Sequence, residues 1–213
     1  MVLEMARATD IRGHLDAQRA AFLRDGSPTL ATRIDRLDRA IDLLVTHRHA
    51  LNDAMSADFG HRSRDLSDLT DIASGIGALK FAKAHVAKWM RPQRRAVEFP
   101  FGLLGARAEV QFQPKGVVGI LSPWNFPVNL TFGPLAGVLA AGNRCMIKPS
   151  EFTEATSTLM KRLIGEYFSA DEVVVVTGGP EVGAAFTALP FDHLLFTGAT
   201  SVARHVMRAA AEN

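Results

Sequence analysis

Cysteine is almost absent from this sequence: Cys145 is the only one in 213 residues. A single cysteine cannot form an intrachain disulfide, so a disulfide-stapled fold is excluded. Sparse cysteine is typical of a reducing compartment, and we expect a cytoplasmic protein. Cys145 lies in an apolar run with Met146 and Ile147, where a thiol is normally inert, so we do not expect it to be a nucleophile.

Long apolar runs are missing as well. Glycine, proline or a charged residue interrupts each apolar stretch well before the roughly 20 residues needed to cross a bilayer. The opening residues 1–7 lack the continuous apolar core of a signal peptide. We therefore expect no membrane span.

The sequence also lacks the features of a nucleic-acid or metal site. No aromatic side chains are interleaved with the basic cluster at residues 91–95, although stacking aromatics are typical of proteins that bind single strands. His47 and His49 are too close along a helix to share a face, and no cysteine or acidic partner stands at ligand spacing around them. We expect no nucleic-acid partner and no bound metal.

Apolar residues are plentiful, at 47% of the chain against 22% charged, which suits a globular protein with a sizeable core. Residues 1–95 are predicted to form a helical part. One helix has an apolar stripe and a charged opposite face, and a longer one with near-heptad spacing ends before Pro92. Both stripes are expected to pack in the core. The first stripe is Ile34, Leu37, Ile41, Leu44 and Val45, opposite Arg33, Asp35, Arg36, Asp38, Arg39 and Asp42, and the second is Leu69, Ile72, Ile76, Leu79, Val86 and Met90.

Residues 96–115 contain scattered glycine, proline and phenylalanine, and Ala108, Val110 and Phe112 alternate as in an extended strand. Their partner strand is not evident from the sequence. We predict an arm or hairpin that lies on the surface or pairs with another chain, and it is a candidate oligomerisation element.

Residues 116–213 contain short apolar runs, each followed by a turn and a helix-like segment. Such strands, apolar on both faces and alternating with helices, indicate a parallel sheet covered on both sides. We predict an α/β fold with a Rossmann-like parallel sheet and helices on both faces, preceded by the N-terminal helical segment. The runs are residues 117–121, 145–147, 173–176 and 194–196.

The four predicted strands end in turns that carry polar groups or glycine. Ligands of an open parallel sheet bind beyond the carboxyl ends of its strands, so we expect these turns to face one crevice. The turns are Ser122-Pro123-Trp124-Asn125, Lys148-Pro149-Ser150-Glu151, Thr177-Gly178-Gly179 and Thr197-Gly198-Ala199-Thr200.

The second turn offers Lys148 as a donor to ribose hydroxyls or a phosphate and Glu151 as an acceptor from the same hydroxyls. Alternatively, Lys148 is a surface lysine and Ser150 is the N-cap of the next helix. Lys148 and Ser150 also have the spacing of a Ser–Lys nucleophile pair, which we discount because no second base or oxyanion partner is in view.

Glycines mark the last two turns. Gly179 and Gly183 lie in a segment that only approximates the dinucleotide fingerprint, because G-x-G-x-x-G is absent, and a tight turn with proline near a helix start is the alternative. Thr197, Gly198 and Ala199 open the final helix, whose free backbone N–H groups suit a pyrophosphate.

Asn125 is the candidate for catalysis. It lies on a turn between two prolines, and a rigidly held side-chain amide can stabilise an oxyanion. The ordinary alternative is a turn asparagine that hydrogen-bonds its own backbone. Trp124 is expected to pack beside it and to wall the cofactor site.

Together these segments resemble the aldehyde dehydrogenase family, in the branch of the class 3 and coniferyl-aldehyde enzymes, and the resemblance extends over the whole chain. Its carriers, in this order and spacing, are Pro123-Trp124-Asn125-Phe126-Pro127, Ala141-Gly142-Asn143, Lys148-Pro149-Ser150-Glu151 and Phe196-Thr197-Gly198.

The resemblance implies roles for individual residues. Asn125 matches the asparagine whose amide helps to hold the thiohemiacetal oxyanion, and Trp124 matches the aromatic residue that lines the cofactor cleft. Lys148 matches the lysine that binds the adenosine ribose, and Glu151 matches the carboxylate beside it. Gly198 begins the helix that faces the pyrophosphate.

The resemblance implies the oxidation of an aldehyde, in this branch an aromatic or long-chain one such as coniferyl aldehyde, to a carboxylic acid with NAD or NADP. It also implies a homodimer in the full-length form. Ala199 stands where many relatives have serine, which removes one hydroxyl contact to phosphate but leaves the backbone donors.

In the family, the general base, the nucleophilic cysteine and the catalytic domain follow the point where this chain ends, and Cys145 does not match the nucleophile. We therefore expect the N-terminal portion of a longer enzyme or a truncated reading frame. The alternatives are a catalytically inactive nucleotide-binding fragment or pseudoenzyme, and an unstable truncation.

Overall fold

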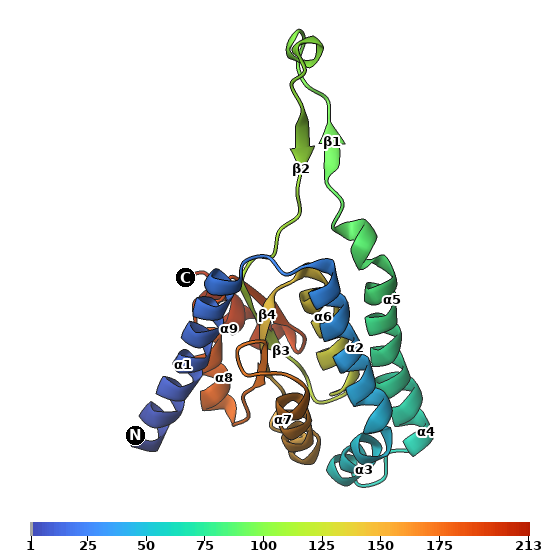
Figure 1. Cartoon of the computed structure of the whole chain (residues 1–213). Coiled ribbons are helices and arrows are strands. Elements are labelled where there is room, and N and C mark those ends of the chain that lie inside the picture. The colour runs from blue at the N-terminus through green and yellow to red at the C-terminus, as the bar shows by residue number, and fades with distance from the viewer. Residues whose placement is uncertain (1) are drawn as a thin grey trace.

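The computed structural model describes the backbone of residues 2–213 and the side chains of residues 11–213. Its centre is a sheet of four parallel strands in the order β5-β4-β3-β6, which confirms the predicted α/β fold (Figure 1). The strands occupy almost the residues that the apolar runs predicted. They are β3 (Val117–Leu121), β4 (Arg144–Lys148), β5 (Val173–Val175) and β6 (His193–Phe196).

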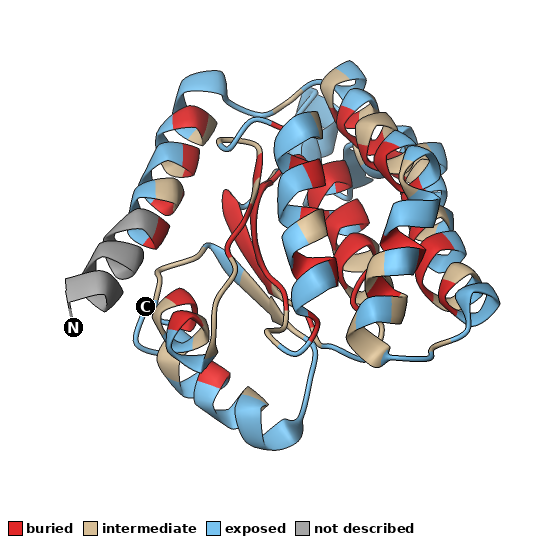
Figure 2. Cartoon of the chain, turned by 90° about the horizontal axis from the view of Figure 1, so that it is seen from below, coloured by how far each residue is buried: buried red, intermediate tan, exposed pale blue. Residues whose placement is uncertain are grey.

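Helices cover both faces of the sheet, and Figure 2 shows the buried strands between them. Val118 and Cys145 face one set of helices, whereas Val117 and Met146 face the other set. Successive side chains of a strand point to opposite faces, so strands covered on both sides must be apolar throughout. The first set is α2 (Leu30–Thr46), α3 (Arg48–Phe59), α5 (Ser74–Trp89), α6 (Asn129–Ala141) and α7 (Glu154–Tyr167), and the second is α1 (Val2–Asp25) and α8 (Pro180–Thr187).

The N-terminal helices share one core with the strands, and two arginines on the charged face of α2 are buried. Arg33 donates a hydrogen bond to the Ala140 carbonyl at 3.0 Å, and Arg36 pairs with Glu172 at 2.9 Å. Burial would raise the pKa of Glu172, but hydrogen bonds from Arg39 and Arg36 lower it to about 2. The sequence did not reveal the burial of these two arginines, because their polar partners lie far away in the chain.

The long helix predicted before Pro92 contains a π-helical stretch. It consists of α4 (Arg64–Ser67), the π-helix η1 (Asp68–Ala73) and then α5. A π turn holds more residues than an α turn, so it rotates the following side chains relative to the preceding ones. Asp71 is therefore fully buried, whereas Leu69, predicted to be in the core, is 69% exposed.

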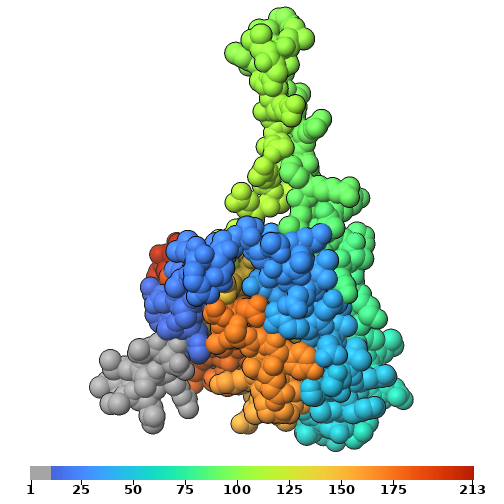
Figure 3. Space-filling view, in the orientation of Figure 1, coloured from blue at the N-terminus to red at the C-terminus, as the bar shows by residue number. Residues whose placement is uncertain are grey.

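Residues 93–110 form a hairpin that projects from the body of the molecule (Figures 1 and 3). Its strands are β1 (Gln93–Arg95) and β2 (Ala108–Val110), with a 3-10 helix η2 (Phe101–Leu104) at the tip. The partner strand that the sequence did not reveal is thus part of the basic cluster that precedes the predicted arm. Several large apolar side chains of the hairpin are exposed, namely Phe99, Phe101, Leu103, Leu104 and Val110.

Candidate functional site

The strand order places the four strand-end turns along one edge of the sheet. The Ser122 amide after β3 donates to the carbonyl of Lys148 on β4 at 3.2 Å. The Thr197 amide after β6 donates to the Leu121 carbonyl at 3.2 Å. The turn after β5 lies beyond that of β4, so all four turns follow one another along this edge. The sequence predicted that they face one crevice, but among the described residues only the turns after β4 and β5 line a common cavity.

The turn after β4 carries an ion pair whose lysine is buried and whose carboxylate is partly exposed. Lys148 is only 5% exposed, and its Nζ donates to Oε2 of Glu151 at 2.9 Å. Burial opposes ionisation of Glu151, but the hydrogen bond and the charge of Lys148 outweigh it and lower the pKa of this carboxyl. The alternative of a surface lysine is therefore wrong. A cation and a carboxylate stand together where a strand ends, which suits the hydroxyl groups of a sugar.

The helix that follows this turn is capped from a distance, and Ser150 is not its N-cap. α7 begins at Glu154 with Thr153 as N-cap, and the Thr153 side chain makes no capping bond. Instead Asp58, at the end of α3, accepts hydrogen bonds from the amides of Ala155 and Thr156 at 2.9 and 2.8 Å. A carboxylate there satisfies two free N–H groups and interacts favourably with the helix dipole.

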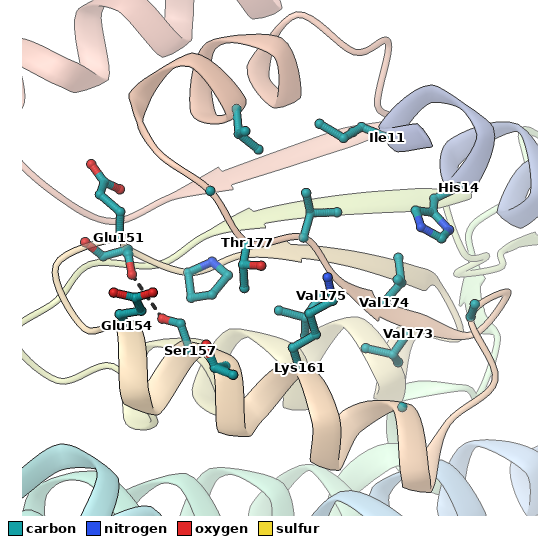
Figure 4. Close-up of a pocket in the computed structure, with 18 of the residues that line it drawn as sticks. Ile11, His14, Glu151, Glu154, Ser157, Lys161, Val173, Val174, Val175 and Thr177 are labelled. Atoms are coloured by element: carbon teal, nitrogen blue, oxygen red, sulfur yellow. Dashed lines mark hydrogen bonds between the residues drawn. The ribbon is translucent and has the colours of Figure 1, made fainter. Parts of the chain in front are cut away.

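A cavity of about 860 Å³ adjoins this turn and runs along the edge strand β5 between α7 and α1 (Figure 4). Ser150 and Glu151 line it from the turn after β4, and Gly178 and Gly179 line it from the turn after β5. Ser157 donates a hydrogen bond to the Ser150 carbonyl at 3.0 Å, which ties α7 to this wall. Other polar lining residues are His14, Glu154, Thr158, Lys161, Ser169 and Thr177.

Two glycines bring α8 close to the end of the sheet. Gly178 has φ +153°, and a Cβ added to it would lie 2.4 Å from Cγ2 of Val182. A Cβ on Gly183 would already be within 3.9 Å of Cε of Lys148, so α8 passes directly over the lysine stem. Gly179 is the N-cap of α8, and proline follows at the first helical turn, as the tight-turn alternative predicted. The same turn also lines the cavity.

Asn125 lies in the turn between β3 and α6, outside the cavity. Its side chain is exposed, and no described residue forms a hydrogen bond with its amide, so the self-bonded alternative is not observed. Its backbone carbonyl accepts a hydrogen bond from Arg62 at 2.8 Å. Trp124 is 51% exposed, and its ring centroid lies 6.4 Å from that of Phe59. The backbone of Asn125 is thus held by Arg62, whereas its side-chain amide has no hydrogen-bond partner among the described residues.

The turn after β6 is exposed and is not part of the cavity. Thr197, Gly198 and Ala199 are all exposed, and they precede α9 (Thr200–Ala210). Ala199 is the N-cap of α9 and forms no side-chain cap. The predicted cofactor residues therefore fall into two groups. Ser150, Glu151 and Gly179 line the cavity with Lys148 and Gly183 beside them, whereas Trp124, Thr197, Gly198 and Ala199 lie on the two neighbouring turns.

Sequence reasoning missed the charged residues that hold these turns. Asp71 accepts hydrogen bonds from the backbone amides of Val128 and Asn129, and it pairs with Arg62 at 2.7 Å. Burial raises the pKa of Asp71, although the two amides and the charge of Arg62 oppose that rise. Asp71 and Asp58 stood among ordinary helix surface residues in the sequence. No local pattern marks a carboxylate whose partner lies 57 residues or more away.

Cys145 is fully buried, and burial raises the pKa of its thiol, so the thiolate that a nucleophile needs is disfavoured. The described residues contain no group of three or more histidine, cysteine or acidic side chains arranged to hold a metal ion. No helix within the described part of the chain is long and apolar enough to cross a membrane.

Together, the sheet and its strand-end turns define an α/β protein with a Rossmann-like parallel sheet whose four turns lie along its carboxyl edge. Residues 2–213 match the model of the aldehyde dehydrogenase family, and the chain belongs to this family.

Similar proteins include enzymes named for coniferyl aldehyde. A probable coniferyl aldehyde dehydrogenase of Caulobacter vibrioides is 60% identical over 200 residues, covering 93% of this chain and 41% of the relative. A coniferyl aldehyde dehydrogenase of a Pseudomonas species is 54% identical over 206 residues, covering 97% of this chain and 42% of the relative. The chain thus spans about two-fifths of the length of these relatives.

Solved structures share the fold. AldH of Staphylococcus aureus in a substrate-bound state superposes with a TM-score of 0.89 at 30% identity, over 95% of this chain and 44% of that chain. An NAD-dependent benzaldehyde dehydrogenase of Corynebacterium glutamicum superposes with a TM-score of 0.82 at 27% identity, over 97% of this chain and 44% of that chain.

Proposed function

We propose that this chain is the cofactor-binding half of an NAD(P)-dependent aldehyde dehydrogenase, which oxidises an aldehyde to a carboxylic acid. The observation that carries the proposal is the ion pair of the buried Lys148 with the partly exposed Glu151, beside the cavity at the carboxyl edge of the sheet. Family membership supports the reaction class. The names of the most similar relatives favour coniferyl aldehyde or another aromatic aldehyde as the substrate.

The donor set along this edge of the sheet fits a dinucleotide. Lys148 has three N–H donors and gives one to Glu151, so cation and carboxylate can both reach the hydroxyls of a ribose. Gly179 at the start of α8, and Gly198 with Ala199 at the start of α9, present helix N-termini that favour phosphate. When bound, NAD(P) would supply the hydride acceptor for the oxidation. Lys148 and Glu151 would hold the ribose hydroxyls where β4 ends.

Asn125 supplies the oxyanion contact in this proposal. Its exposed amide is not hydrogen-bonded to any described residue, so its N–H₂ is available to a developing negative charge on the substrate oxygen. Asn125→Ala in the active enzyme that contains this chain should lower kcat by about 100- to 1000-fold. The variant should unfold at the same temperature, because the side chain is exposed and makes no hydrogen bond within the described residues.

Asn213→Ala is the control, because it removes another exposed amide, which donates to the Ala188 and Ala209 carbonyls and lies outside the four turns. It should leave aldehyde-dependent NADH formation unchanged. Normal turnover by Asn125→Ala would show that the oxyanion contact is not made by this residue.

The second candidate function is nucleotide binding without catalysis. It is favoured by Cys145, the only cysteine of the chain, which is buried with a raised thiol pKa and offers no nucleophile. Purified residues 1–213 separate the two functions. NADH formation from an aldehyde by this chain alone contradicts the inactive module, whereas nucleotide binding by calorimetry without turnover supports it. Absence of binding contradicts both functions.

The hairpin supports a further part of the proposal, a homodimer in the full-length form. Its exposed apolar side chains, among them Phe101 and Leu103, are of the kind that a second copy would cover. Light scattering on the full-length form measures its mass directly. A dimer that becomes a monomer in the double variant F101D and L103D supports this role, and an unchanged mass contradicts it.

A further inference from the structure

Two charged side chains of the N-terminal helical segment hold the turn that carries Asn125. Arg62 donates from Nη1 to the Asn125 carbonyl at 2.8 Å and from Nη2 to Oδ2 of Asp71 at 2.7 Å. Asp71 Oδ1 in turn accepts from the amides of Val128 and Asn129 at 3.0 and 3.1 Å. Both ends of the turn are therefore tied to one ion pair.

This ion pair is withdrawn from solvent. The Arg62 side chain is 9% exposed and the Asp71 side chain 0%. Burying two charges is costly, and a buried ion pair is seldom a net source of stability. The presence of this pair beneath the turn therefore needs an explanation other than stability. The planar guanidinium fork explains it, because one side chain can donate in two directions at fixed angles. A lysine cannot reach both acceptors in this way.

Two aromatic rings lie close to the guanidinium. Its central carbon lies 4.9 Å from the ring centroid of Phe59 on α3 and 5.1 Å from that of Phe126 on the turn. Phe59 also contacts Trp124, the neighbour of Asn125. Stacking of this kind adds to the hydrogen bonds and limits rotation of the arginine. Phe59, Arg62 and Asp71 all lie in the segment from α3 to η1.

The π-helix η1 places the carboxylate. Asp71 lies inside the π turn, which directs its side chain toward the start of α6. Such π-helical turns occur frequently at functional sites. A regular α-helix through the same residues would present a different side chain at this point.

We infer that Arg62, held by Asp71, is a positioning residue for Asn125: it fixes the backbone of the turn so that the free amide keeps one direction. The inference rests on the proposed function of Asn125. The ion pair itself touches no substrate and acts only through the turn.

Hydrogen exchange of residues 1–213 tests the structural half of this inference. Arg62→Met keeps the apolar stem and removes all donors, and Arg62→Lys keeps the charge but not the fork. Arg64→Met is the matched control, because Arg64 forms an exposed pair with Asp53 at 2.6 Å. Arg62→Met should speed exchange in peptides over residues 122–131 by about tenfold or more, through loss of local protection, and leave residues 144–156 unchanged.

Arg62→Lys should show a smaller increase in the same peptides, and it serves as the test variant if Arg62→Met does not fold. Unchanged exchange over residues 122–131 in Arg62→Lys and in any folded Arg62→Met overturns the inference. An equal increase in both regions also overturns it, because that result describes general destabilisation.

Kinetics of the active enzyme that contains this chain test the functional half. Arg62→Met, or Arg62→Lys in its place, should lower kcat by about 10- to 100-fold, as for a misplaced catalytic group, with an unchanged KM for NAD(P). In an Asn125→Ala background the same change should cost less than about twofold, because coupled residues are not additive. Equal losses in both backgrounds overturn the positioning role. If Asn125→Ala alone has no effect, the proposed oxyanion contact fails, while hydrogen exchange still decides whether Arg62 holds the turn.

Discussion

The turns after β3 and β4 differ from the turns after β5 and β6 in how they are held. Side chains from the N-terminal helical segment hold the first two: Arg62 and Asp71 the turn after β3, and Asp58 the helix after β4. In the described part of the chain, no side-chain hydrogen bond reaches residues 177–179 or 197–200.

The difference follows the chemistry that each turn is proposed to perform. Asn125, Lys148 and Glu151 would act through side chains, whose direction must be fixed for one geometry. The turns after β5 and β6 would act through backbone N–H groups at helix N-termini, which the helix itself orients. A turn that binds a ligand through its backbone N–H groups needs glycine and open space more than it needs side chains that hold it.

Among the changes that test this difference between the turns, the largest effect on stability is expected from removing Asp58, which caps α7. Asp58→Ala leaves the amides of Ala155 and Thr156 without their acceptor, so we expect a loss of about 1–2 kcal/mol in the free energy of unfolding. Asp58→Asn should lose less, because an amide oxygen can still accept. Urea unfolding of residues 1–213 measures both values.

Asp53→Ala is the control for this variant, because Asp53 lies on the same helix in an exposed pair with Arg64. Its effect should stay below about 0.5 kcal/mol. An equally small loss for Asp58→Ala would mean that the turn after β4 does not depend on Asp58 for its stability. That result would contradict the proposed difference between the two pairs of turns.

A smaller effect is expected from adding a side-chain acceptor to the turn after β6. Ala199 is the N-cap of α9 without a side-chain acceptor, so Ala199→Ser should stabilise the chain by about 0.5–1 kcal/mol. Ala203→Ser, inside the same helix, should instead destabilise it by a few tenths of a kcal/mol, on the order of its lower helix propensity. Thermal unfolding of the two variants side by side gives the sign. Destabilisation by Ala199→Ser would show that the turn after β6 is already satisfied.

Much of the fold was readable from local sequence. The four apolar runs predicted the strands, and the turns between them predicted the shared edge, because both depend on residues close together in the chain. The sequence was less informative where residues far away in the chain determine burial or helix capping. Arg33 and Arg36 are buried because their acceptors lie on α6 and before β5, and α7 is capped by Asp58 and not by Ser150.

The site was predicted to the same extent and for the same reason. Lys148, Glu151 and Gly179 were identified by their position after strands, and the structure places them at or beside one cavity. The roles of these residues and of Asn125 remain predictions. Arg62 and Asp71 could not be identified, because a π turn changed which helix residue points inward. The backbone groups that they hold, on Asn125, Val128 and Asn129, are also 57 or more residues away in the sequence.

The most direct test of the account is a calorimetric titration of NAD⁺ and NADP⁺ into residues 1–213 and two lysine variants. Lys148→Met removes the donor of the Lys148–Glu151 pair, and Lys83→Met removes an exposed lysine paired with Asp38 on the far helices. The account predicts binding that Lys148→Met weakens by about tenfold or more, as for loss of a charged hydrogen bond, and that Lys83→Met leaves unchanged. Equal nucleotide affinity of the original chain and Lys148→Met would contradict it.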